Sequence, residues 1–170
     1  MNRGFTLIEL GVVLMVVGIL TALVIPGYRY ATARADSAKC LGNLRSIGLA
    51  LNGWLADNNM TMPPLVAARA SRDEEVMVID NTLSPFTDDQ RIFACPADRS
   101  QAKSTGTSYY WNSALSGQSA LNLNLFTFIT DLSRIPILVD KEGWHKASEN
   151  RVNHLFADGH VANQIDFRAE

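Results

Sequence analysis

Apolar residues are concentrated at the start of the chain. Residues 5–25 form an almost uninterrupted apolar segment in which Glu9 is the single charge. A helix of about 21 residues spans roughly 30 Å, which matches the hydrocarbon core of a bilayer. A core helix of a small domain would be polar on one face, and a secretory signal peptide has a shorter apolar centre followed by a small-residue cleavage site. The pattern therefore predicts a membrane-inserted helix over residues 5–26.

Beyond Pro26 the pattern becomes that of an amphipathic helix over residues 27–57. The apolar positions recur at spacings of three and four: Cys40, Leu41, Leu44, Ile47, Gly48, Leu51, Trp54 and Leu55. Pro26 has no amide hydrogen, which predicts a kink at this point. The polar and proline-rich residues 57–64 end the helix. We therefore expect one long helix whose first half lies in lipid or in a filament core and whose second half packs on a soluble domain.

The remaining residues, 58–170, carry shorter patterns. Residues 65–91 mix charges with turn formers, which is typical of a loop with one short helix or strand. Five strand-like runs follow: Thr107–Trp111, Leu125–Ile129, Ile135–Val139, Asn153–Ala157 and His160–Ile165. Asp158-Gly159 between the last two predicts a hairpin with a two-residue turn and positive φ at both positions. The fold class expected is α+β, with a small antiparallel sheet on the helix stripe.

Composition excludes several classes of protein. The 170 residues are 47% hydrophobic with a formal net charge of −2, and the basic residues are dispersed, which excludes a nucleic-acid binder that neutralises phosphates. Two cysteines are too few for a disulfide scaffold, and no Cys/His spacing is typical of a zinc site. No Ser/His/Asp motif, nucleotide-binding glycine loop or paired-carboxylate signature is present. We therefore expect no catalytic residues, and we expect that the protein is not an enzyme.

The histidines lie close together near the C-terminus. His145, His154, Asp158 and His160 all offer metal-binding atoms. A two-residue turn would pair residue 157 with His160, and alternation along the strands would then place His154 and His160 on opposite faces of the sheet. We therefore expect no metal site here, and the roles of the three histidines stay open.

Glu9 is the anomaly in the apolar segment. A carboxylate inside a membrane helix costs a few kcal/mol and is usually paired or functional. The segment offers it no cationic side chain. Cleavage between Gly4 and Phe5 would create an amine, and in an array of identical subunits the amine of one could pair with Glu9 of the next. The alternative is a shallow Glu9 whose side chain reaches the headgroups.

The first residues resemble a known signal. Met1–Gly4 followed by F-T-L-I-E, with a proline at Pro26, is similar to the type III signal of type IV prepilins and type II secretion pseudopilins. The resemblance implies that residues 1–4 are a leader, which prepilin peptidase removes after Gly4. It further implies that Phe5 becomes the N-methylated terminus, and that Phe5 and Glu9 set the register of a filament.

The resemblance also implies partners and location. The partners would be prepilin peptidase, other pilin-like subunits and an inner-membrane assembly platform, with no nucleic acid. The chain would cross the bacterial inner membrane once, with residues 58–170 outside the cytoplasm, and then enter a filament. Basic residues flank both ends of the apolar segment, so they do not choose an orientation.

Cys40 lies on the predicted helix and Cys95 begins a Cys-Pro pair. Outside the cytoplasm, such a pair forms a disulfide or stays as two buried free thiols. The disulfide would contribute roughly 3–5 kcal/mol. The Cys-Pro pair, Y-Y-W-N at 109–112 and F-A-D-G-H-V at 156–161 resemble a branch of large bacterial pseudopilins, which favours the disulfide. In that branch nine residues separate a histidine from the Asp-Gly, and this chain has Ser148 at the position of that histidine.

Structural calcium is a further implication of the resemblance, because major pseudopilins of type II secretion often bind it in C-terminal loops. Asp140, Glu142, Asp158 and Asp166 offer oxygen ligands, but their spacing is not that of a calcium loop. We therefore expect no metal and no cofactor, with structural calcium left open.

The function expected is that of a pilin-like structural subunit, a type II secretion pseudopilin in a short periplasmic filament. Two alternatives remain. One is a surface type IV pilus subunit, which would share the assembly chemistry. The other is a membrane-tethered binding or enzymatic domain that uses the same anchor.

Overall fold

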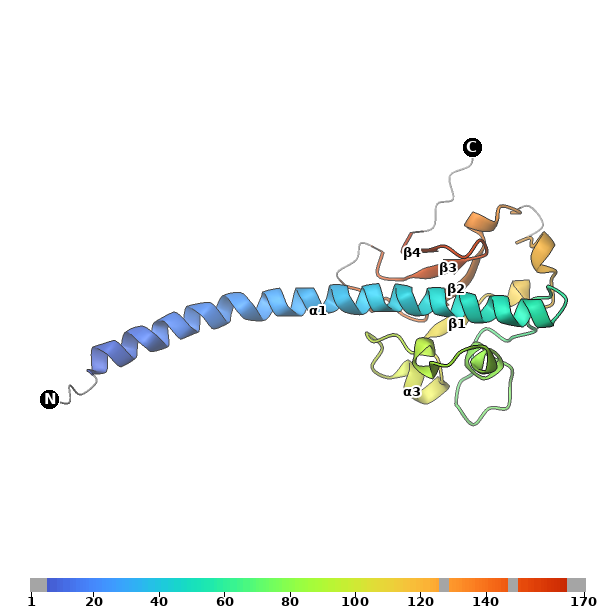
Figure 1. Ribbon diagram of the computed structural model, residues 1–170. Helices are drawn as coiled ribbons and strands as arrows, with labels where there is room; N and C mark the ends of the chain where they lie inside the picture. Colours follow the sequence, from blue (N-terminus) through green and yellow to red (C-terminus); the bar gives the residue numbers. More distant parts are fainter. Residues whose placement is uncertain (1–5, 126–128, 147–149, 165–170) are drawn as a thin grey trace.

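A computed structural model describes residues 6–125, 129–146 and 150–164. The helices are α1 (Leu7–Asp57), α2 (Ile79–Thr82) and α3 (Gln101–Thr105), and the strands are β1 (Tyr109–Trp111), β2 (Pro136–Asp140), β3 (His154–Phe156) and β4 (Val161–Ala162). Figure 1 shows α1 projecting far beyond a small domain that surrounds its C-terminal half. This pilin-like arrangement confirms the α+β prediction.

Helix α1 is one continuous helix of 51 residues. It runs through Pro26 without interruption, and Figure 1 shows a gradual curve in its N-terminal half rather than a sharp bend. The localised kink expected at Pro26 is therefore not seen. The proline removes a single backbone hydrogen bond, and the turns on either side keep theirs.

The two halves of α1 differ completely in burial. Residues 6–31 are exposed throughout. The buried residues all lie further along the helix: Ser37, Cys40, Asn43, Leu44, Ile47, Ala50, Leu51 and Leu55. The predicted apolar stripe is thus confirmed as the face that packs on the domain. Asn43 joins it because its side-chain Nδ2 donates to the carbonyl of Ala94 at 2.9 Å.

The strands form one antiparallel sheet in the order β1-β2-β3-β4. Contacts between α1 and both β3 and β4 place the helix stripe against the sheet, and Leu44, Leu138 and Leu155 belong to the shared core. The prediction of a strand over Leu125–Ile129 is wrong, because its two end residues pair with each other in an isolated antiparallel bridge. Residues 126–128 lie outside the described part.

The β3–β4 hairpin corrects the predicted turn. Its loop has three residues, 157–159: Gly159 donates to the carbonyl of Phe156 at 2.9 Å, and Phe156 donates to the carbonyl of His160 at 2.9 Å. Gly159 alone has positive φ, at 88°, as in a type I turn closed by a glycine bulge. The register therefore shifts by one residue, and His160 stacks on Phe156 with ring centroids 4.2 Å apart. The prediction that His154 and His160 face opposite sides is wrong for the same reason.

Gly106 ends α3 with φ at 91°. It lies against the half-buried ion pair of Arg69 and Asp80, and Arg69 Nε also donates to the carbonyl of Thr105 at 2.6 Å. A Cβ at residue 106 would overlap both the guanidinium and the carboxylate. This position therefore needs glycine for its backbone conformation and for space.

We predict that Gly106→Ala destabilises the chain more than Gly159→Ala. Both substitutions place a side chain at positive φ, which costs about 1 kcal/mol, but only residue 106 adds an overlap, since nothing lies within 4 Å of a Cβ at residue 159. The extra cost is about 1–3 kcal/mol. Denaturant unfolding of each full-length variant in detergent measures these losses of stability. Equal unfolding midpoints for Gly106→Ala and Gly159→Ala would contradict the prediction.

Candidate functional site

The N-terminal end of α1 is closed by a reciprocal cap between Thr6 and Glu9. The Thr6 amide and hydroxyl donate to Glu9 Oε2 at 2.9 and 2.8 Å, and the Glu9 amide donates to Thr6 Oγ1 at 3.3 Å. This is a capping box, which satisfies backbone donors that a helix start leaves unpaired. Its sequence signature, threonine followed three residues later by glutamate, was present in the sequence but was missed there.

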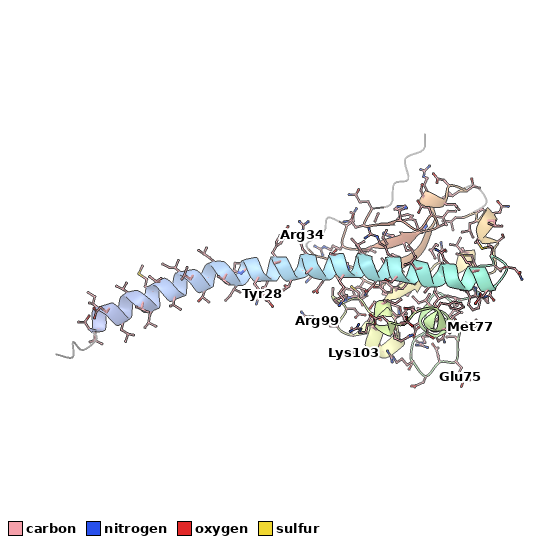
Figure 2. All side chains as sticks on the ribbon, in the orientation of Figure 1. Tyr28, Arg34, Glu75, Met77, Arg99 and Lys103 are labelled. Atoms are coloured by element: carbon pink, nitrogen blue, oxygen red, sulfur yellow. The ribbon has the colours of Figure 1, made fainter. Side chains whose placement is uncertain are left out.

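The apolar half of α1 is bare in the single chain. Figure 2 shows its side chains projecting outward along the helix before and around Tyr28. Several large ones are more than half exposed, among them Leu7 at 89% and Leu14 at 63%. Among the described residues, this helix alone is long and apolar enough to cross a membrane. Its N-terminal half therefore needs lipid or neighbouring helices as its environment. The predicted cleavage site, Gly4 and Phe5, lies outside the described residues.

A second group of chemically active side chains lies inside the domain. Cys40 comes from α1, Cys95 from the loop after residues 90–93, Asp140 from the end of β2, and His145 from the loop that follows. All four are buried, with exposed fractions between 0% and 3%. One ligand atom from each lies within 4.8 Å of the others. We call these four residues the Cys-Asp-His cluster.

The cluster is held by short polar contacts. Cys40 Sγ donates to Asp140 Oδ1 at 3.2 Å, His145 Nε2 lies 3.2 Å from Asp140 Oδ2, and Cys95 Sγ lies 3.5 Å from His145 Nε2. The Asn153 amide donates to Asp140 Oδ2 at 2.7 Å, and the Tyr109 hydroxyl lies 3.5 Å from Cys40 Sγ. Each of the four side chains therefore contacts at least one other.

The two cysteines considered for a disulfide meet inside the domain. Both are free thiols in the structure. The sequence led correctly to two cysteines that meet across the domain, but it gave no sign that a carboxylate and an imidazole join them. The four residues come from four separate segments, so no spacing motif marks them. The only available signal was local, namely a buried-helix cysteine and a Cys-Pro loop.

The cluster separates charge inside the core. A hydrogen bond with Cys40 lowers the pKa of Cys95 to about 6 against the opposing effect of burial. Burial lowers the pKa of His145, but hydrogen bonds with Asp140 and Cys95 outweigh it and raise that pKa to about 9. The hydrogen bond with Cys95, together with burial, raises the pKa of Cys40. These shifts favour the thiolate form of Cys95 and the imidazolium form of His145.

Asp98 fixes the loop that carries Cys95. Its carboxylate accepts from the amides of Ser100, Gln101 and Ala102 at 2.7–2.9 Å and from the Ser108 hydroxyl at 2.6 Å. Ser108 Oγ in turn accepts from the Cys95 amide at 2.9 Å. The Cys95 backbone is therefore positioned through a chain of hydrogen bonds from one carboxylate.

The carboxylates considered for calcium are not gathered. Asp140 belongs to the Cys-Asp-His cluster, Glu142 accepts from Gln101 Nε2 at 2.9 Å, and Asp158 lies 2.6 Å from His160 Nδ1. Asp166 lies outside the described residues. Within the described ranges, the Cys-Asp-His cluster is the one group of three or more such side chains placed to hold an ion.

Comparison with known proteins supports the prepilin resemblance. The chain is 39% identical over 58 residues to type II secretion system core protein G of Pectobacterium carotovorum, covering 34% of this chain and 37% of that protein. It is 31% identical to core protein G of Escherichia coli over 81 aligned positions, covering 39% and 56%. It is 36% identical over 58 residues to the type IV major pilin protein PilA of Myxococcus xanthus, covering 34% and 26%.

These matches make the chain pseudopilin-like over part of its length. It spans between about a quarter and just over half of the length of these three relatives. No family model matches the chain, and no solved structure matches it.

We predict that Asp98→Asn destabilises the chain by about 1 kcal/mol at pH 7. Burial raises the pKa of Asp98, but its four hydrogen bonds outweigh this and lower it. A depressed pKa means that the carboxylate stabilises the fold above its ordinary value near 4 and loses this effect as the pH falls through the folded-state pKa.

The variant should therefore lose less stability than the parent on acidification below about pH 4. Unfolding midpoints across pH measure this. Asp131→Asn is the matched control, because Asp131 caps a turn through Ser133 and has no contact with the Cys95 loop. If the unfolding midpoints of Asp98→Asn and of the parent fell equally on acidification, the stabilising role of the Asp98 carboxylate would be contradicted.

Proposed function

We propose that this protein is a structural subunit of a pilin-like filament, specifically a type II secretion pseudopilin that assembles in the periplasm after removal of residues 1–4. The observation that carries the proposal is the division of α1. One helix has a C-terminal half that packs on the domain and an N-terminal half that stays exposed among the described residues. A single carboxylate lies at the start of that bare half.

The bare half of α1 supports assembly by close helix packing. In lipid, helices associate through van der Waals contact and small residues rather than through hydrophobic transfer. Gly11 and Gly18 are among the small residues of this half, and beyond the adjoining helix backbone nothing in the described chain lies within 4 Å of a Cβ at either. Neighbouring helices in a filament would supply the missing contacts, while the domains would cover the outside.

Glu9 would act as the register device. Cleavage after Gly4 would place a charged amine at Phe5, and a neighbouring subunit could bring that amine to the Glu9 carboxylate. The Thr6 cap leaves Glu9 exposed in the single chain. A buried charge pair is the arrangement that best lowers the cost of a carboxylate at this depth.

The proposed location and partners follow from the same helix. The chain would first sit in the bacterial inner membrane with its domain in the periplasm. Prepilin peptidase would cleave and methylate it, and an inner-membrane assembly platform would add it to other pilin-like subunits. A surface type IV pilus subunit is the second candidate, favoured by the match to a type IV major pilin.

The first prediction from this proposal concerns the mature N-terminus. Intact-mass and N-terminal peptide analysis of the chain from cells with prepilin peptidase should find N-methylated Phe5 as the first residue. Cells without the peptidase should retain Met1–Gly4. An intact Met1 in the presence of the peptidase, or cleavage after Pro26, would rule out the assembly route.

The second prediction separates the two roles of Glu9. Glu9→Gln keeps a side-chain oxygen for the Thr6 cap but loses the charge. We expect this variant to insert in the membrane normally and to fail to form filaments, measured by pelleting of sheared filaments and by electron microscopy.

Glu75→Gln is the matched control, since Glu75 is an exposed surface residue of the domain, labelled in Figure 2. It should assemble as the parent does. Normal filaments from Glu9→Gln would show that Glu9 only caps its own helix.

A further inference from the structure

We propose that Cys40, Cys95, Asp140 and His145 form a closed zinc site that joins α1 to the loops of the domain. The proposal concerns the domain interior and does not rest on filament assembly. It changes the interpretation of the two cysteines from a disulfide to metal ligands.

The geometry fits a four-coordinate ion. Zinc bonds of 2.0–2.3 Å in a tetrahedron separate the ligand atoms by about 3.3–3.8 Å. Cys40 Sγ lies 3.2 Å from Asp140 Oδ1, His145 Nε2 lies 3.2 Å from Asp140 Oδ2, and Cys95 Sγ lies 3.5 Å from His145 Nε2. One ligand atom from each residue lies within 4.8 Å of the other three. A small outward movement of the side chains would therefore seat the ion at their centre.

The donor set selects the metal. Two thiolates and one imidazole favour zinc over calcium or magnesium, which take oxygen ligands. All four protein positions are filled and buried, which is typical of a structural site rather than a catalytic one with an open position. Zinc binding would release any proton held by the two sulfur atoms or by the ligating histidine nitrogen, because thiolate and neutral imidazole are the ligating forms.

Hydrogen bonds around the cluster would hold the ligands. The Asn153 amide donates to Asp140 Oδ2 at 2.7 Å, and the Tyr109 hydroxyl lies 3.5 Å from Cys40 Sγ. The Ser108 hydroxyl fixes the Cys95 backbone. Such outer contacts orient metal ligands and are a regular part of zinc sites.

The site would have a clear structural role. Its ligands come from the helix, the Cys95 loop, the end of β2 and the loop after it. One ion would therefore tie four segments that no regular hydrogen-bonded element joins together. Its two positive charges would also offset most of the negative charge of the carboxylate and the two thiolates in the core, where unpaired charge is costly.

The test uses the full chain in detergent, purified without a metal-affinity tag and analysed for bound metal by mass spectrometry. We expect about one zinc per chain. Replacing zinc with cobalt should give thiolate-to-cobalt charge-transfer bands and the visible bands of a tetrahedral ion. The cobalt spectrum is recorded on the parent chain, so it does not depend on whether variants fold.

Variants then assign the ligands. Cys95→Ser and His145→Gln should each lower zinc affinity by about tenfold or more, measured by competition with a chelator. His154→Gln is the matched control, because His154 lies outside the cluster, and it should bind as the parent does.

Three results would overturn the proposal. The first is the absence of bound zinc in parent chain purified from cells that were grown with added zinc. The second is a parent chain lighter by two hydrogens and unreactive to thiol alkylation, which identifies a disulfide. The third is zinc binding in Cys95→Ser and His145→Gln that equals that of the parent.

Discussion

Helix α1 has to satisfy two environments along a single axis, and the rest of the structure follows from that constraint. Its C-terminal half supplies the stripe on which the sheet and loops pack, including Leu44, Ile47 and Leu51. Its N-terminal half has no packing partner in the single chain. The two halves belong to one helix of 51 residues that runs through Pro26, so the apolar half is joined to the domain core without an intervening loop.

The domain is correspondingly built to hold α1. The sheet has short strands, and much of the chain between α1 and β1 is loop, fixed by side-chain hydrogen bonds and by the Arg69–Asp80 ion pair. The Cys-Asp-His cluster lies where the helix meets the Cys95 loop, the end of β2 and the loop that follows β2. Contacts that connect separate segments stabilise such a domain most, because its loops contribute few backbone hydrogen bonds of their own.

The sequence predicted the parts of this structure that depend on periodicity or local chemistry. The apolar run and the three-and-four spacing located α1 and its buried stripe. The hairpin was found, but its register was not, because one glycine bulge at Gly159 moves every partner by a residue. The cluster lay beyond sequence reasoning, since its ligands meet only through tertiary packing. The Thr6–Glu9 cap was within reach, because its motif is local.

The central claim is that the bare half of α1 is completed by other copies of itself or by related subunits. A cryo-electron microscopy reconstruction of filaments containing this chain tests it most directly. We expect the apolar halves to pack at the filament centre, with the Glu9 carboxylate about 3 Å from the N-terminal amine of a neighbouring subunit. Filaments in which these halves do not touch, with Glu9 bonded only to its own Thr6, would contradict the account.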